Sequence, residues 1–170
     1  MTMRRSAAEI RSGYLPGAIG RIVELHGAYY GTNWGFGAFF EARMARELAD
    51  FVSRFDPQRD GLWTAFAAGR IVGSIAIDGA HADDEGAHLR WFILDECQRG
   101  QGTGRRLLEE AVGFCRRCGH RRVMLWTFSG LDAARQLYEQ AGFRLTAESR
   151  GAQWGREVTE QRFELRLTHG

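Results

Sequence analysis

A glycine-rich run, Arg99–Gly104, constrains this chain more than any other feature of its sequence. The segment before it, Leu89–Leu94, is aromatic and β-branched, which predicts a strand. The segment after it, Arg105–Cys118, places its apolar side chains on one helical face. Glycines between a strand and a helix let the backbone approach an anion, and the free amides of the helix N-terminus point at that anion. The run therefore predicts a phosphate-binding turn, with a plain turn before a helix as the alternative.

The turn does not match the two commonest phosphate-binding motifs. A nucleoside-triphosphate loop needs Lys-Ser or Lys-Thr after its last glycine, and here Gly104 is followed by two arginines. A dinucleotide fingerprint needs a third glycine where Arg106 stands, and an acidic residue about 20 positions later. The pattern that remains is Arg-x-x-Gly-x-Gly, formed by Arg99, Gly102 and Gly104.

A second motif lies downstream, where residues 133–143 read Ala-Ala-Arg-Gln-Leu-Tyr-Glu-Gln-Ala-Gly-Phe. The two motifs, in this order and with a strand-like segment at 123–127 between them, resemble the GNAT superfamily of N-acetyltransferases. That superfamily has Arg-x-x-Gly-x-Gly and Ala-x-x-Leu-Tyr-x-x-x-Gly-Phe at these places. The resemblance covers roughly residues 60–167. It extends to the acetyltransferase half of bacterial proteins that fuse a MarR-type DNA-binding domain to a GNAT domain.

The resemblance implies an α/β (α+β) GNAT fold, with a mixed, mostly antiparallel sheet, splayed fourth and fifth strands, and helices on both faces. It implies acetyl-CoA (coenzyme A) as cofactor and acetyl transfer to a primary amine by direct attack on the thioester. The alternative is a non-catalytic acyl-CoA-binding sensor or regulatory module. The residues expected to bind the cofactor are Phe92, Ile93, Leu94, Arg99, Gly100, Gln101, Gly102, Thr103, Gly104, Arg105, Ser129 and Tyr138.

Three residues are candidates for proton transfer. Tyr138 is the expected general acid, because a phenol has a pKa near 10, above the roughly 8.5 of a thiol. Its alternative role is packing beside Leu137 in a helix. Glu85 and His88, at the start of the strand before the turn, are the candidate bases, and Glu85 is alternatively a solvated member of an acidic loop. We expect no metal site, because acidic loops of this kind are usually only solvated.

Aromatic residues between the first two expected helices, together with one further tryptophan, are the candidate substrate-binding residues. Such a group forms either a pocket wall or a helix–helix core. The sequence does not identify the amine, which we expect to belong to a small molecule. The candidates are Tyr29, Tyr30, Trp34, Phe36 and Trp126.

Periodicity and turn residues predict alternating strands and helices along the chain. The second helix is expected to bury Phe39, Met44, Leu48, Phe51 and Val52. The expected elements are a strand at 9–11, helices from 16 to about 30 and at 38–55, strands at 62–66, 70–77 and 89–94, a helix at 105–118, a strand at 122–127, a helix at 132–141, and strands at 143–148 and 158–167.

Length and composition favour one cytoplasmic domain spanning residues 1–170. The formal net charge of +2 is too small to indicate a nucleic-acid partner, and every basic side chain apart from histidine is an arginine. No apolar run reaches the length of a membrane span, and no apolar core follows the basic N-terminus as in a secretory signal. We expect neither nucleic acid nor membrane as partner, and keep a homodimer as an option.

Overall fold

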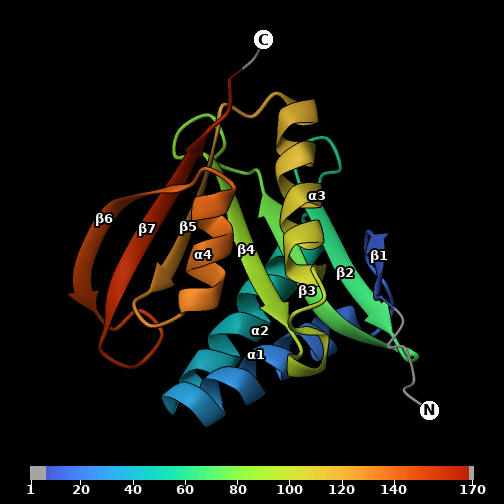
Figure 1. Cartoon of the computed structure of the whole chain (residues 1–170), viewed down its shortest axis with the longest axis vertical. Helices are drawn as coiled ribbons and strands as arrows, with labels where there is room; N and C mark the ends of the chain where they lie inside the picture. Colours follow the sequence, from blue (N-terminus) through green and yellow to red (C-terminus); the bar gives the residue numbers. More distant parts are fainter. Residues whose placement is uncertain (1–6, 169–170) are drawn as a thin grey trace.

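The computed structural model describes residues 7–168. Within these residues the strands form one seven-stranded sheet in the order β1-β2-β3-β4-β5-β7-β6, with α1 and α2 on one face and α3 and α4 on the other (Figure 1). The elements are β1 (Glu9–Ser12), α1 (Ala18–Trp34), α2 (Ala38–Ser53), β2 (Gly61–Ala67), β3 (Arg70–Asp78), β4 (Ala87–Leu94), η1 (Glu96–Gln98), α3 (Thr103–Cys118), β5 (Arg122–Phe128), α4 (Asp132–Gln140), β6 (Arg144–Gly151) and β7 (Val158–Arg166).

The sheet is mixed and mostly antiparallel, which confirms the expected fold class. Among the strands of residues 7–168, only β4 and β5 run parallel, and they pair at just two positions, Ala87 with Val123 and His88 with Met124. Beyond His88 the two strands diverge, as Figure 1 shows. The expected splay is therefore confirmed, and it leaves one edge of β4 without a neighbouring strand along most of its length.

Glycines in the left-handed conformation decide where two helices begin and end. Helix α1 continues past Gly31, one turn beyond its expected end, and stops where Gly35 adopts a φ of 69°. Helix α3 begins at Thr103, two residues earlier than expected, because Gly102 caps it with a φ of 79°. Glycine adopts this conformation without the steric cost of a Cβ.

The buried face of α2 differs from the expected one at its first turn. Phe39 was expected to be buried and is 60% exposed, whereas Phe40 is 4% exposed. The residues that meet α1 and the sheet follow Phe40 at helical spacing, at Leu48 and Phe51, and Phe39 lies about 100° away around the helix. The helix ends at Ser53, before Pro57.

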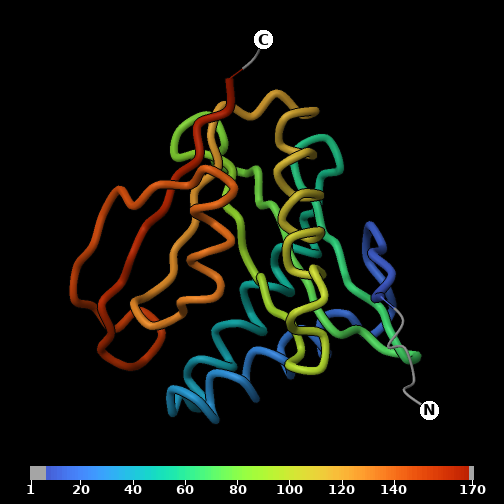
Figure 2. The backbone as a smooth tube through the Cα atoms, viewed as in Figure 1, coloured from blue at the N-terminus to red at the C-terminus, as the bar shows by residue number. Residues whose placement is uncertain are grey.

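The core has two main layers, one on each face of the sheet. Leu107 and Ala111 of α3 pack against one face, and Ile22 of α1 with Phe51 of α2 packs against the other. A smaller aromatic cluster at one end of the sheet, where β5 ends, is formed by Phe36, Phe40 and Phe128. β6 forms the edge of the sheet beyond β7, at the opposite side from β1 (Figure 2), and nearly all of it is exposed, whereas β7 contributes Phe163 and Leu165 to the core.

Candidate active site

A cavity of about 800 Å³ opens where β4 and β5 separate. Its walls come from both strands, from α1 and α2, from the glycine turn that starts α3, and from α4. Cavities of this size accommodate small molecules and cofactors. The cavity therefore lies in the gap where β4 and β5 no longer pair, and it is not formed by an inserted loop.

The glycine turn forms one end of the cavity. Gly100 and Gly102 have φ values of 75° and 79°, and a Cβ added to either would have no atom within 4 Å. Gly104 instead lies in the first turn of α3, where an added Cβ would be 3.2 Å from Leu137 Cδ1. Two glycines thus leave open space in front of the helix N-terminus, and the third lets α3 pack closely on α4.

Polar atoms without a partner mark this end of the cavity as a place for a ligand. Thr103 Oγ1 and Gln98 Oε1 are buried and make no hydrogen bond within residues 7–168, although both residues line the cavity. The first amides of α3 also lack partners within the helix. Arg99 and Arg105 line the same end and carry positive charge. This donor-rich, cationic turn fits an anionic group such as a pyrophosphate.

A bulge interrupts β4 beside the cavity. The pairing of β3 with β4 shifts between Ser74 and Ala76, so that β4 carries an extra residue at this point. Trp91 lies in the bulge with a φ of 48°, which is rare for a bulky side chain. The residues that follow it, Phe92, Ile93 and Leu94, which are candidate cofactor contacts, all line the cavity.

Tyr138 of α4 is packed in the core and also lines the cavity. It is 6% exposed, and its ring centroid lies 5.9 Å from that of Phe92 and 5.8 Å from that of Phe143. No hydrogen bond from its hydroxyl occurs within residues 7–168. Burial raises the pKa of Tyr138, and the neighbouring Tyr30 adds a smaller effect in the same direction. The hydroxyl of Tyr138 therefore keeps its proton at neutral pH. The packing role and the proton-donor role expected from the sequence are thus compatible.

Aromatic side chains surround the opposite end of the cavity. Tyr29 and Tyr30 of α1 and Trp126 of β5, three of the candidate substrate-binding residues, line it. Trp126 is 39% exposed, although it lies on a central strand of the sheet. Arg99 reaches across from the glycine turn, with its guanidinium carbon 5.0 Å from the centre of the Tyr29 ring. The glycine turn and the aromatic lining of the cavity are therefore in contact where Arg99 meets α1.

A cluster of charged residues at the aromatic end was not predicted. Glu47 of α2 lines the cavity, and each of its carboxylate oxygens accepts a hydrogen bond from an arginine. Arg43 donates to Oε1 at 2.9 Å, and Arg90 of β4 donates to Oε2. The sequence carries a signal for this cluster, since Arg43 and Glu47 are four residues apart on one helix and His88 alternates with Arg90 on one strand.

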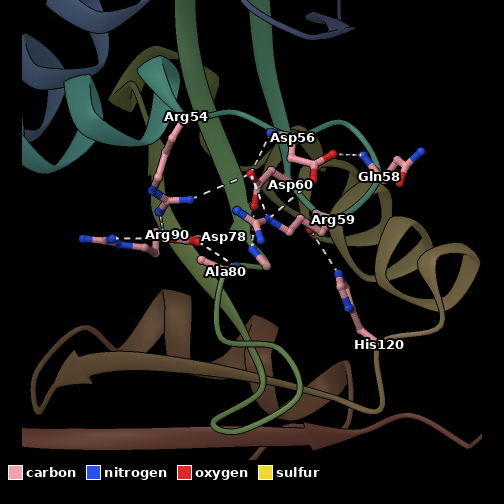
Figure 3. A network of polar contacts seen from close by, with 10 residues as sticks. Arg54, Asp56, Gln58, Arg59, Asp60, Asp78, Ala80, Arg90 and His120 are labelled. Atoms are coloured by element: carbon pink, nitrogen blue, oxygen red, sulfur yellow. Dashed lines mark hydrogen bonds and ion pairs between the residues drawn. The ribbon is translucent and has the colours of Figure 1, made fainter.

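Arg90 also belongs to an ion-pair network that includes Asp78, Arg54 and Asp60 (Figure 3). Arg90 Nη1 lies 3.5 Å from Asp78 Oδ2, and Arg54 Nη2 lies 2.6 Å from the same oxygen. Burial alone would raise the pKa of Asp78, but the Ala80 amide and the two arginines outweigh it and lower that pKa. The network continues to Asp60, which is 1% exposed. The position of Arg90 is therefore fixed from two sides.

Of the two candidate bases, only His88 lines the cavity. Burial, with a smaller contribution from Arg90, lowers the pKa of His88 to about 3, so its imidazole is neutral at neutral pH. A second histidine, His26 of α1, also lines the cavity. Its Nδ1 lies 2.7 Å from the carbonyl oxygen of Ile22, and burial lowers its pKa to about 4.

Trp34 and Phe36 belong to the aromatic cluster at the end of the sheet and do not line the cavity. The Phe36 ring lies 5.6 Å from that of Phe128, and the Trp34 ring lies 4.8 Å from it. Gly130 makes room for Trp34, since a Cβ there would be 2.4 Å from the indole. The expectation that these two residues contact a substrate is therefore corrected in favour of the core.

Three further predicted residues also lie outside the cavity. Glu85 is exposed in the turn before β4, because Gly86, with a φ of 103°, directs the chain into the strand only after it. The side chain of Gln101 turns back and donates to the carbonyl of Cys97 at 3.2 Å. Ser129 is exposed beyond β5, where its amide donates to the carbonyl of Thr159. The cavity lining therefore includes neither Glu85, expected as a base, nor Gln101 and Ser129, expected as cofactor contacts.

Groups of metal ligands and membrane-spanning helices are both absent from residues 7–168. In that part of the chain no three His, Cys, Asp or Glu residues are grouped as metal ligands. Nor does it contain a helix with the length and apolar character needed to cross a membrane.

Two curated relatives resemble most of the described chain. "N-acetyltransferase 8" of Homo sapiens is 23% identical over 124 residues, which cover 71% of this chain and 55% of that protein. "Probable N-acetyltransferase camello" of Xenopus laevis is 26% identical over 135 residues, covering 78% of this chain and 61% of that protein. The chain thus spans little more than half the length of these relatives.

Solved structures share the fold across nearly the whole chain. The Salmonella typhimurium protein yncA, solved with its cofactor acetyl-CoA, has a TM-score of 0.75 at 20% identity and covers 97% of this chain and 96% of its own. A phosphinothricin acetyltransferase from Sinorhizobium meliloti, in complex with acetyl-CoA, has a TM-score of 0.71 at 19% identity, with coverage of 95% and 89%. The family model described as the acetyltransferase (GNAT) family matches residues 21–143, and this chain belongs to that family.

Proposed function

We propose that this protein is an acetyl-CoA-dependent N-acetyltransferase that transfers an acetyl group to a primary amine of a small molecule. One observation carries the proposal: a single cavity joins the turn at the N-terminus of α3, the open edge of β4 and the hydroxyl-bearing side chain of Tyr138. Family membership supports the reaction class, and the acetyl-CoA named for two structural relatives supports the donor. Acetyl-CoA supplies an acetyl group that is activated as a thioester.

The glycine turn and β4 would hold the donor. Backbone amides of Gly100–Gly104 and the positive end of the α3 dipole suit the pyrophosphate, and Arg99 and Arg105 add charge-assisted contacts. The unpaired edge of β4 at residues 92–94 offers backbone groups to an extended arm, as an added strand would use them. This chain therefore presents separate sites for the charged and the neutral part of one long ligand.

Two groups act where the acetyl group is transferred. A backbone N–H of β4 stabilises the negative charge that develops on the thioester oxygen. Tyr138 donates a proton to the departing sulfur, which it can do because its raised pKa keeps the phenol protonated. An enclosed phenol beside the open strand edge is suited to this role.

The attacking amine must lose a proton, because an alkyl ammonium has a pKa near 10. His88 is neutral and lines the cavity, so it can accept a hydrogen bond from the amine or from an intervening water. Its low pKa makes it a weak proton acceptor, and Glu47 has both oxygens engaged by arginines. We therefore assign to His88 the orientation of the amine, and to solvent the final removal of the proton.

The aromatic end of the cavity supports a small acceptor with an apolar body. Tyr29, Tyr30 and Trp126 provide flat apolar surface, and Trp154 from the loop between β6 and β7 adds to it. The Arg43–Glu47 pair supplies the polar contacts there. A screen of small primary amines that follows free thiol release from acetyl-CoA tests the proposal.

The weak base at this end favours a second candidate function, an acyl-CoA-binding module without catalysis. Both candidates predict binding of acetyl-CoA by calorimetry, and only the enzyme predicts thiol release that depends on an acceptor. Binding without release across a broad amine screen would favour the module. Absence of binding would reject both.

A further inference from the structure

We propose that Ser74 of β3 is a positioning residue that aims the backbone N–H of Phe92 into the cavity. The inference rests on the proposed function, because it names the N–H that faces the thioester oxygen and the side chain that fixes its direction. Ser74 itself does not line the cavity, and its side chain is completely buried in the sheet.

The bulge in β4 gives Ser74 its role. Where the pairing of β3 and β4 shifts, the carbonyl of Trp91 loses its place in the regular ladder between the strands. A buried carbonyl needs a partner, and Ser74 supplies one: its Oγ donates to the Trp91 oxygen at 2.7 Å. The serine hydroxyl thus replaces a backbone donor at the point where the ladder is interrupted.

The orientation of one peptide plane follows from this hydrogen bond. The described chain contains no cis peptide bond, so the Trp91 carbonyl and the Phe92 N–H point in opposite directions. Ser74 holds the carbonyl on the β3 side, and the Phe92 N–H therefore points to the other side of β4. On that side β5 has already diverged, and Phe92 lines the cavity there.

Packing around Trp91 supports the same orientation. The φ of 48° at Trp91 is a rare conformation that persists only when its surroundings impose it. The indole is 5% exposed, with its ring 5.2 Å from that of Phe51 and 4.2 Å from the Arg90 guanidinium carbon. These contacts hold the side chain, while Ser74 is the polar contact to the peptide itself. Hydrogen-bond strength falls steeply with misalignment, so the loss of Ser74 weakens whatever the Phe92 N–H binds.

The matched test compares Ser74→Ala with Thr64→Val. Thr64 pairs with Ser74 across β2 and β3, is equally buried, and its hydroxyl has no hydrogen-bond partner within residues 7–168. We expect Ser74→Ala to lower kcat by about 10- to 100-fold, less than the roughly 10²–10³-fold loss when an oxyanion-hole donor is deleted. The dissociation constant of Ser74→Ala for acetyl-CoA should rise by less than about tenfold, because only one hydrogen bond to the ligand is weakened. Ser74→Cys, which keeps a weak donor, should fall between Ser74→Ala and the parent protein, and Thr64→Val should match the parent.

A spectroscopic measurement separates positioning from general damage. In the infrared spectrum of bound, isotope-labelled acetyl-CoA, the thioester carbonyl should absorb at higher frequency in Ser74→Ala than in the parent protein, because its hydrogen bond is weaker. An unchanged frequency in Ser74→Ala, or an equal loss of kcat in Thr64→Val, would overturn the proposal. The infrared comparison needs no acceptor amine. Failure to transfer acetyl therefore counts against the enzyme function alone, and an unchanged carbonyl frequency counts against Ser74.

Discussion

The two ends of the cavity are built in different ways. The cofactor end is a turn within one short segment, Arg99–Gly104, followed directly by the helix that it starts. The acceptor end is assembled from side chains of α1, α2, β4, β5 and the loop between β6 and β7. The first depends on backbone conformation, which glycine positions reveal, and the second depends on how distant elements pack. Substitutions at the cofactor end should therefore change acetyl-CoA binding alone. Substitutions at the acceptor end should change both the stability of the fold and the binding of the acceptor.

The largest effect is expected at the cofactor end. Gly102→Glu places a carboxylate where the cavity is open and anions are expected, and it also forces a side chain into a left-handed conformation. We expect binding of acetyl-CoA to be lost in calorimetry. Gly119→Glu is the control, because Gly119 caps the other end of α3 with a φ of 78° and equally open space. It carries the same backbone strain and should bind normally; equal loss in both variants would show that strain, not the cradle, is responsible.

The next effect tests whether Tyr138 joins the two ends chemically or only by packing. Tyr138→Phe keeps the ring that contacts Phe92 and Phe143 and removes only the hydroxyl. If the phenol is the general acid, turnover should fall by roughly 10²–10⁴-fold, with acetyl-CoA affinity preserved. Steady-state kinetics and calorimetry measure the two quantities. The exposed Tyr14 provides a control as Tyr14→Phe, and normal turnover in Tyr138→Phe would leave packing as the role of Tyr138.

The contrast between the two ends also explains what the sequence could predict. The turn, the α3 start and the β4 edge follow from local residue types, so the sequence alone suggests Phe92, Gly102 and Thr103 as cofactor contacts, and all three line the cavity. Glu47 and Arg43 were missed because a charged pair on a helix is usually solvated, and only the meeting of α2 with β4 encloses it. The β4 bulge could not be predicted from the local sequence, because a bulky residue such as Trp91 rarely adopts a positive φ.

Substitution of Trp34 tests whether this residue belongs to the core and not to the acceptor end of the cavity. Because Trp34 packs on Phe128 and over Gly130, Trp34→Ala should lower the free energy of unfolding by about 2–3 kcal/mol, somewhat less than a fully buried aromatic. Trp126→Ala is its counterpart on the cavity wall, and should raise the acceptor KM with a smaller loss of stability. Denaturant unfolding and kinetics distinguish the two, and the reverse assignment of effects would return Trp34 to the substrate pocket.

The smallest effect concerns pH, and it should arise at the acceptor end through His26. Its pKa in the folded protein is about 4, below the 6.5 of an exposed histidine, so protons bind the unfolded chain more tightly. The stability that neutral His26 contributes is therefore complete above pH 6.5 and is lost as the pH falls toward 4. The difference corresponds to about 2 kcal/mol between pH 7 and pH 5. His88, with a pKa of about 3, should contribute in the same direction.

The variant His26→Gln removes one titrating group. Its unfolding free energy, measured by denaturant titration at pH 7 and pH 5, should therefore change less between the two pH values than that of the parent protein. An identical pH dependence in the two proteins would mean that His26 is accessible to protons in the folded state, and that the cavity beside it is wetter than its aromatic lining implies.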